Sequence, residues 1–295
     1  MASAKNDSTR VPGWAVATTV ALGVGALLWA ERRRALRTPS PAARSEGSER
    51  IVTNLVMAGL TAAVSTAAMA PVVAPLAERA ERSRLGLTQR LPAQAWVRDA
   101  VAIVLLDYTL YWWHVLEHRV PWLYRFHQVH HADLALDTTT ALRFHFGEFL
   151  ASVPWRAAQV VLLGASPRAL RVWQRLTMGS VLFHHSNARL PLRWERRLSQ
   201  VMMTPRLHGI HHSIIIEEQD SNWSSGLSIW DRLHGTYRAD VPQEDIEIGV
   251  AAYRAPDDVT LARSLVMPFR PLPATPPRDA VLASCANRDA GADAM

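Results

Sequence analysis

Cysteine is almost absent from this chain of 295 residues. A single cysteine, Cys285, excludes an intramolecular disulfide and a metal site built from several thiolates, so any metal must be bound by nitrogen and oxygen ligands. The sequence also lacks helix-turn-helix and zinc-finger patterns, so we expect no nucleic-acid partner despite the net charge of +6. Most of the cations are Arg beside apolar runs, which is typical of the cytoplasmic face of a membrane protein.

Charge is absent from residues 13–30, a run just long enough to cross the hydrocarbon core of a bilayer. The run ends in Glu-Arg-Arg-Arg instead of a small-residue cleavage site, which favours an uncleaved anchor over a signal peptide. A second apolar run, 51–77, predicts another span, and we expect Pro71 and Pro75 to kink it or end it early.

Two further apolar regions follow. Residues 100–113 contain Asp107, which is costly in lipid and is therefore expected to face a protein interior. Residues 149–183 predict a helical hairpin, which is shallow or packed against other helices because it contains three arginines (Arg156, Arg171 and Arg175).

The loop between the first two spans is rich in arginine, which favours the cytoplasmic side for it. Its arginines are Arg32, Arg33, Arg34, Arg37, Arg44 and Arg50. Counting crossings from this loop places every histidine cluster on the same side. The expected fold is all-α, an integral-membrane helical bundle with a cytoplasmic, histidine-rich helical cap. We expect N-terminal spans and loops over 1–92, a catalytic domain over 93–265 and a disordered tail, rich in Pro and Ala, over 266–295.

All twelve histidines lie between residues 114 and 234. Ten of them fall into four clusters: His114 and His118; His127, His130 and His131; His184 and His185; His208, His211 and His212. Histidines three or four positions apart share one face of a helix, whereas adjacent histidines diverge by one residue's rotation. Each triplet can therefore address two metal ions.

A single pair of histidines at helical spacing is more often an ordinary helix feature than a metal site. Four clusters together are different, because so many imidazoles packed without a ligand are poorly solvated and repel one another when protonated. Ten nitrogen donors exceed the needs of one tetrahedral zinc and suit two ions, for which iron, copper and zinc are all compatible with imidazole.

The series of histidine boxes resembles the fatty acid hydroxylase/sterol desaturase superfamily of membrane-bound di-iron oxygenases. Three stretches are similar to that family as well: TTALRFHFGE (139–148), TPRLHGIHHS (204–213) and DSNWSSGLSIWDRLHGTY (220–237). The resemblance covers about 100 to 240.

The resemblance implies two iron ions, with zinc able to substitute in a purified protein. It implies an oxygen-dependent oxidoreductase that hydroxylates or desaturates a lipid such as a sterol or fatty acid. Its implied partners are the bilayer, the lipid substrate and a separate electron donor (a ferredoxin, cytochrome or reductase). The implied metal ligands are His114, His118, His127, His130, His131, His208, His211 and His212, with His185, and His184 after it, from the third cluster.

Supporting roles behind the ligands are expected for Asp107, His145, Glu148, Asn187 and Asn222, although a turn-capping role is equally compatible with Asn222. His234 is expected to be a packed or surface histidine. The alternative function is non-enzymatic: a histidine-rich membrane protein that stores or transports a divalent metal. Transport is disfavoured because the clusters lie at helix ends instead of within spans.

Overall fold

A computed structural model describes residues 13–274 and 276–280. Cys285 and positions 281–295 of the expected tail lie outside the described residues. Within them the chain is all-α, as the sequence predicted, and its only β contacts are three isolated bridges. The α-helices are α1 (Gly13–Arg33), α2 (Pro41–Val64), α3 (Ala70–Arg82), α4 (Ala95–Arg119), α5 (Pro121–His131), α6 (Phe146–Leu163), α7 (Pro167–His185), α8 (Leu192–Leu198), α9 (Pro205–His211), α10 (Ile216–Gln219), α11 (Ile229–His234) and α12 (Leu261–Val266). Short 3-10 turns lie at Thr88–Arg90, Thr140–Leu142, Pro256–Val259 and Met267–Phe269.

The helices α2 and α3 form one long rod that is joined through a π-helical turn, Ser65–Met69. The helix does not end at Pro71 or Pro75, contrary to one of the two outcomes expected. The π turn lies directly before Pro71, where the helix register must adjust for a residue that lacks an N–H and whose ring crowds the preceding turn. The rod begins at Pro41, ten residues before the predicted span, with a break at Gly47 (φ 53°).

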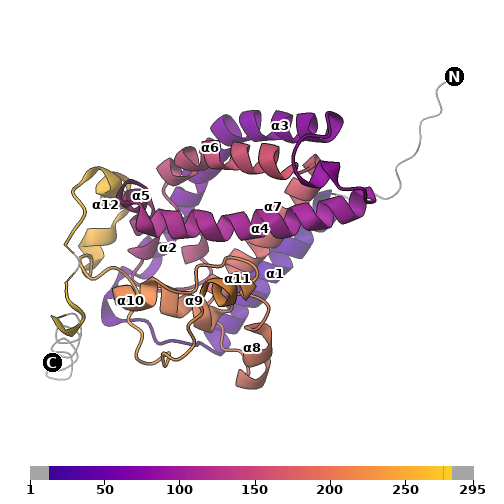
Figure 1. Cartoon of the computed structure of the whole chain (residues 1–295). Helices are drawn as coiled ribbons and strands as arrows, with labels where there is room; N and C mark the ends of the chain where they lie inside the picture. The colour runs from indigo at the N-terminus through magenta and orange to yellow at the C-terminus, as the bar shows by residue number, and fades with distance from the viewer. Residues whose placement is uncertain (1–12, 275, 281–295) are drawn as a thin grey trace, which may run out of the picture.

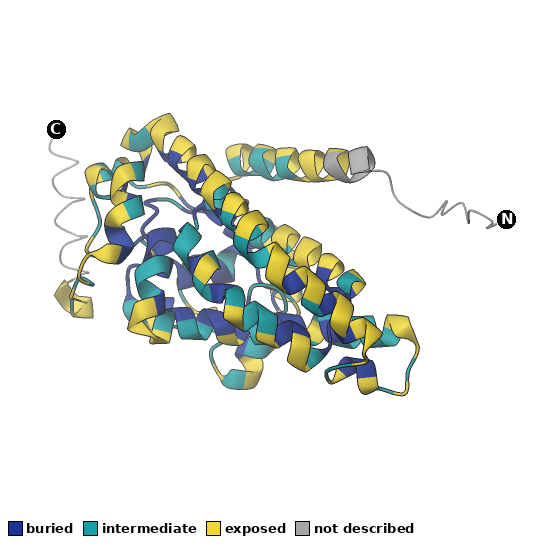
Figure 2. Cartoon of the chain, turned by 90° about the horizontal axis from the view of Figure 1, so that it is seen from above, coloured by how far each residue is buried: buried dark blue, intermediate teal, exposed yellow. Residues whose placement is uncertain are grey.

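This rod is the one helix of the described chain that is long and apolar enough to cross a membrane, over Pro41–Arg82. Only 17% of its most apolar stretch is buried, so most of it faces outward instead of filling a core, as Figure 2 shows along the edge of the molecule. The span predicted at 13–30 forms most of α1, and the one predicted at 100–113 lies in α4, which does not meet this criterion; the number of crossings stays a prediction.

The hairpin predicted for 149–183 is confirmed as α6 and α7, which turn at Gly164. Gly164 has a left-handed φ of 76°, and a β-carbon there would collide with the backbone of Leu85. Together with α3 and α4 the hairpin surrounds an apolar core that includes Leu106, Trp113 and Trp173. These helices form the upper half of the molecule in Figure 1, and the shorter helices α8–α11 lie below α4.

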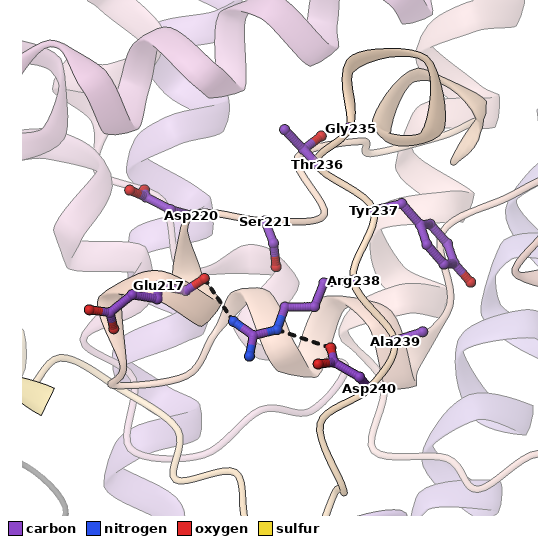
Figure 3. A pocket seen from close by; sticks show the side chains of 9 residues that line it. All are labelled: Glu217, Asp220, Ser221, Gly235, Thr236, Tyr237, Arg238, Ala239 and Asp240. Atoms are coloured by element: carbon purple, nitrogen blue, oxygen red, sulfur yellow. Dashed lines mark hydrogen bonds and ion pairs between the residues drawn. The ribbon is translucent and has the colours of Figure 1, made fainter. Parts of the chain in front are cut away.

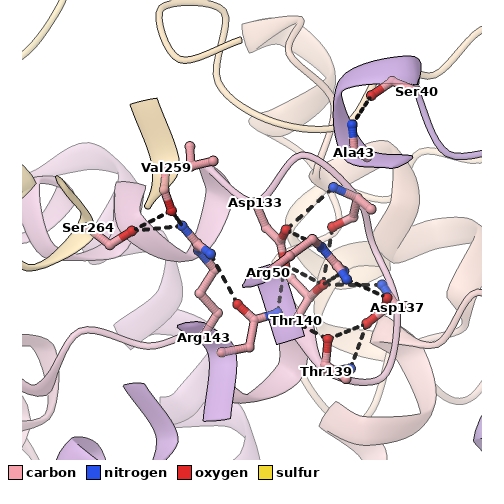
Figure 4. A network of polar contacts seen from close by, with 12 residues as sticks. Ser40, Ala43, Arg50, Asp133, Asp137, Thr139, Thr140, Arg143, Val259 and Ser264 are labelled. Atoms are coloured by element: carbon pink, nitrogen blue, oxygen red, sulfur yellow. Dashed lines mark hydrogen bonds and ion pairs between the residues drawn. The ribbon is translucent and has the colours of Figure 1, made fainter. Parts of the chain in front are cut away.

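The N-terminal part of the chain is fastened to the rest through buried polar contacts (Figure 4). Arg50 of α2 binds the carboxylate of Asp133 at 2.6 Å and that of Asp137 at 2.7 Å. Burial alone raises the pKa of Asp133, but Arg50 and Arg143 hold it below the ordinary value, so the pair stays charged. Because Asp133 follows the second histidine cluster by two residues, this network fixes the end of α5.

Candidate metal centre

Two helices that meet at a sharp turn bring the first two clusters together. The helix α4 ends at Arg119, and Pro121 begins α5 at its first position, where the missing N–H of proline costs no helical hydrogen bond. The helices pack against each other, so that His114 and His118 of α4 face His127 and His131 of α5.

The second triplet, His208, His211 and His212, is carried by the short helix α9 and its C-terminal cap. Thr204 caps its N-terminus by accepting the Leu207 N–H, and Pro205 occupies the first helical position. The sequence TPRLHGIHH thus encodes its own helix start, and the three histidines follow in the next two turns.

The imidazoles converge in two buried groups. The five-histidine group consists of His114, His118, His127, His131 and His211. The four-histidine group consists of His130, His185, His208 and His212. Within each group, one ring nitrogen of every member lies within 4.8 Å of those of all the others.

Adjacent histidines separate between these groups, as their helical rotation predicted. His130 joins the four-histidine group and His131 the five-histidine group, and His212 and His211 divide in the same way. Consecutive residues on a helix differ by about 100° in direction. The two groups are therefore interlocked through α5 and α9.

Hydrogen bonding cannot satisfy these groups. In the four-histidine group the Nε2 atom of His185 lies 3.0 Å from that of His130 and 3.0 Å from that of His208. In the other group the Nε2 atom of His127 lies 3.2 Å from those of His114 and His131. An imidazole nitrogen carries either a proton or a lone pair, so it cannot donate to one neighbour and accept from another.

Other buried nitrogens have no partner at all. The Nε2 atoms of His118 and His211 lack hydrogen bonds in the described structure. Unpaired buried polar atoms are costly, and each deserves an explanation. A cation that accepts lone pairs from all the members of a group resolves both observations, and the donor set of neutral imidazoles fits iron, copper or zinc.

Several rings are turned toward the groups by a hydrogen bond at the outer nitrogen. The Nδ1–H of His114 donates to the carbonyl of Trp223 at 2.6 Å, and that of His211 donates to the carbonyl of Ser221 at 2.9 Å. Such bonds fix the tautomer and leave the Nε2 lone pair free for a metal.

Burial keeps the histidines uncharged. It lowers the pKa of both His185 and His211 to about 3, and the nearby His127 contributes to the effect at His211. Neutral imidazoles at ordinary pH are the form that binds metal.

The third cluster divides as the sequence interpretation preferred. His185 belongs to the four-histidine group, whereas His184 does not, and its ring lies tilted beside that of His208 with centroids 4.1 Å apart. His234 lies away from both groups and contacts the Tyr108 hydroxyl at 3.1 Å. His145 caps α6 by accepting the Gly147 N–H, and its Nε2 contacts the carbonyl of Leu265 at 3.3 Å.

The supporting residues act at different distances from the rings. Glu148 contacts His127 Nδ1 directly, at 3.3 Å. Asp107 accepts hydrogen bonds from the Leu227 N–H and the Trp230 indole, so it holds the loop after Trp223 and contacts no ring of either group in the described structure.

The two predicted asparagines tie backbone segments together. Asn222, with a φ of 54°, donates to the carbonyls of Leu207 and Arg238. The side chain of Asn187 accepts from the N–H of Arg37 and donates to its carbonyl. Both therefore position helices α7 and α9 through the main chain, and neither contacts a ring of the two groups.

Sequence reasoning missed three supporting residues. Glu117, on α4 between the first two histidines, is buried beside Glu148 and lies 3.8 Å from His127 Nδ1. Arg37 is buried against α9 at Gly209, where a β-carbon would collide with it, and donates to the carbonyl of Pro205. Glu31 accepts from the N–H of Asn187 at 2.7 Å. A charged residue inside an apolar helix was a signal for Glu117, but no local pattern identifies the other two.

Comparison with known proteins agrees with this geometry. The sequence profile of the Fatty acid hydroxylase family matches residues 100–236, which include all nine histidines of the two groups. The chain is 31% identical over 151 residues to an ornithine lipid hydroxylase of Rhizobium tropici, covering 51% of this chain and 44% of the relative. It is 32% identical over 143 residues to a cholesterol 25-hydroxylase-like protein of Danio rerio, covering 46% and 54%.

An alkylglycerol monooxygenase of Xenopus tropicalis is 29% identical over 143 residues, covering 48% of this chain and 30% of the relative. The chain thus spans about half or less of the length of these relatives, and no solved structure matches it. The resemblance seen in the histidine boxes is confirmed over this segment: residues 100–236 match the Fatty acid hydroxylase family.

Proposed function

We propose that this protein is a membrane-bound lipid hydroxylase with two metal ions, one in each histidine group. The observation that carries the proposal is the pair of interlocked groups, whose facing Nε2 lone pairs only a cation reconciles. The family match and three relatives named as lipid hydroxylases or monooxygenases support oxygenation over desaturation.

The proposed reaction is R–H + O2 + 2 e⁻ + 2 H⁺ → R–OH + H2O. The carbon is oxidised, dioxygen is reduced, and one oxygen atom leaves as water. Two irons, when bound, supply the activation of dioxygen that no protein side chain provides. The two electrons come from a separate protein, because the sequence contains no flavin, haem or dinucleotide signature.

The side chains of this protein bind and orient the ions and keep the surroundings dry. The nine histidines are ligand candidates: His114, His118, His127, His130, His131, His185, His208, His211 and His212. His184 is the tenth residue expected from the sequence, and as it lies outside the groups we assign it to packing against His208.

The carboxyl pair beside His127 holds a proton. Burial raises the pKa of Glu148 to about 8, and burial together with Glu148 raises that of Glu117 well above its ordinary value. At neutral pH the pair therefore keeps at least one proton next to the His127 Nδ1 atom. We propose that this proton is available to the reaction, which consumes two.

We place the substrate among lipids with a long hydrocarbon part. The relatives act on ornithine lipids, cholesterol and alkylglycerols by their names, and these share only that chemistry. The apolar, outward-facing rod Pro41–Arg82 supports attachment to the bilayer that supplies such lipids. The arginines near the start of this rod favour the cytoplasmic side for the histidine groups.

The second candidate function, storage or transport of a divalent metal, has less support, because the family named by the match is a hydroxylase family. Metal analysis and lipid profiling distinguish the two. We expect about two irons per chain, and a lipid product with one added oxygen that appears in cells expressing the wild type but not His211→Ala. One zinc per chain and no oxygen-dependent change in any lipid would exclude the hydroxylase.

A further inference from the structure

We infer that the arginine-rich helix α8 and the adjoining part of a two-part hollow beside α8 and α9 form the docking surface for an acidic one-electron carrier protein. This inference rests on the proposed function, since a hydroxylase of this kind must receive two electrons. Here the carrier is oxidised by one electron per encounter, and two encounters supply one turnover.

The first part of the hollow has a volume of about 740 Å³ and is shown in Figure 3. The second part, of about 500 Å³, lies next to it. The two share Tyr237, Ala239 and Asp240 as their common wall, so they form one concave surface. A concave surface suits a protruding loop of a partner protein.

Each part lies one short step from a different histidine group. Ser221 lines the first part, and its carbonyl oxygen accepts the hydrogen bond from His211 Nδ1 at 2.9 Å. Leu207 lines the second part and is bonded directly to His208. Electron tunnelling weakens steeply with distance and proceeds best through covalent and hydrogen bonds, so this hollow offers short entry routes to both groups.

The cationic charge belongs to the second part of the hollow and to α8, because the first part is lined by Glu217, Asp220 and Asp240 against Arg238. Arg196, Arg206 and Arg232 line the second part, against the carboxylates of Glu195 and Asp240. Glu195 is buried and bound to Arg206 at 3.0 Å, and Asp240 is bound to Arg238 at 3.1 Å. The exposed charge that remains is cationic, and it is extended by Arg193 and Arg197 on the outer side of α8. Charge of one sign steers an oppositely charged partner and sets the association rate.

Apolar side chains accompany these cations. Leu192 and Trp194 of α8 are each 49% exposed, and the guanidinium groups of Arg193 and Arg197 lie over the Trp194 ring at 5.7 and 5.4 Å. Tryptophan and arginine are the residues that most often dominate the binding energy of protein interfaces.

A protein occupant fits better than a lipid surface. The helix α8 lies at the opposite end of the molecule from α3 and α6 (Figure 1), and the segment just after α1 pairs with the segment that leads into α8, through Ala35 and Ala188. A bilayer surface is broad, and it makes no use of a hollow whose lining residues Ser221 and Leu207 adjoin the histidine groups.

The test uses the full-length, iron-loaded protein with a plant-type [2Fe–2S] ferredoxin, its reductase and NADPH as the electron source. The variant Arg196→Glu/Arg197→Glu reverses two exposed charges on α8. We expect the KM for ferredoxin to rise at least tenfold, while iron content and thermal stability stay at the wild-type level. Dithionite with methyl viologen bypasses docking, so the ratio of ferredoxin-driven to dithionite-driven turnover should fall by a similar factor.

The matched control is Arg79→Glu/Arg82→Glu, which reverses two exposed charges on α3, far from the hollow. Its ferredoxin KM should stay within twofold of the wild type. Raising the salt concentration to 0.5 M should raise the KM of the wild type and of the control, and should leave that of the α8 variant nearly constant.

An equal KM in the α8 variant and the control would overturn the docking inference and would leave the proposed hydroxylase function unaffected. A wild type that forms no product with either electron source would overturn both proposals. If the α8 variant instead loses binding to phosphatidylglycerol vesicles and keeps its ferredoxin KM, the surface is a lipid contact and the inference fails.

Discussion

The two histidine groups are built from the same ligand type but are held in different ways. In the five-histidine group, the outer nitrogens of His114, His127 and His211 contact a backbone carbonyl or a carboxyl group. In the four-histidine group only His185 has such a partner, the carbonyl of Val181 at 2.8 Å. The remaining Nδ1 atoms of that group are unpaired: those of His130, His208 and His212.

The difference shows two ways to orient a ligand. The first group depends on hydrogen bonds to the carbonyls of Ser221 and Trp223 and on the contact with Glu148, which preorganise the rings before a metal binds. The second depends on packing, and its helix α9 is held by Arg37 from outside the family-matched segment. We therefore expect the first group to be sensitive to its carboxyl neighbours and the second to the N-terminal part of the chain.

Removing one ligand from each group should have the largest effect. We expect His211→Ala and His208→Ala each to lower turnover by more than about 100-fold. Each should lose close to one of two bound irons, measured by metal analysis, because the groups are separate cages. Loss of both irons in either variant would show that the groups bind metal as one unit.

Replacing Arg37 by Met should disturb the four-histidine group more than the other, because α9 carries His208 and His212 of that group and only His211 of the five-histidine group. The change removes the donors to the carbonyl of Pro205 and to Gln243, and leaves these buried acceptors unpaired. A loss of stability on the order of 2 kcal/mol is expected. Iron titration with spectroscopic detection should show the four-histidine site weakened more than the five-histidine site, and His185→Ala combined with Arg37→Met should add little further loss at the four-histidine site.

The variant Glu148→Gln tests the five-histidine group. The amide keeps the shape of the side chain but cannot share a proton with Glu117 as a carboxyl does. We expect iron affinity of the five-histidine group and turnover to fall by about 10-fold to 100-fold. Unchanged affinity at both sites would mean that the contact with His127 does not orient the ring.

Acid should destabilise the metal-free protein through both groups. The pKa values of His185 and His211 are about 3 in the folded protein, below the ordinary value of about 6.5, so the unfolded chain binds more protons between these limits. The contribution of these two histidines to the free energy of unfolding is complete above pH 6.5 and is lost as the pH falls toward 3. Each histidine should account for about 2 kcal/mol between pH 7 and 5, measured by unfolding of chelator-treated protein in detergent. A pH-independent free energy of unfolding over this range would contradict the assignment.

The smallest effect is expected for His234→Ala. This ring contacts the Tyr108 hydroxyl and stacks among aromatic side chains, outside both groups. Turnover and iron content should stay within about twofold of the wild type. A loss comparable to that of His208→Ala would show that His234 contributes to one of the histidine groups.

Local patterns in the sequence identified most of the candidate site. The spacing of His127, His130 and His131 fixes which rings share a helix face, because helical rotation depends only on neighbouring residues. The same reasoning anticipated that His211 and His212 diverge. It also anticipated the pair of helices over 149–183, at the end of which His185 lies. At Pro71 it left two outcomes open, a kink or an early end, and the helix continues through a π turn because that adjustment depends on packing along the whole rod.

Composition and short-range spacing were enough to predict the helical class and the pool of metal-ligand candidates, and the order of the histidine boxes indicated the family resemblance. Only the tertiary structure decided how nine histidines divide into groups of five and four, and that Glu31 and Arg37 brace α7 and α9. These contacts join residues more than 150 positions apart. Their formation depends on how the helices pack, which no local pattern records.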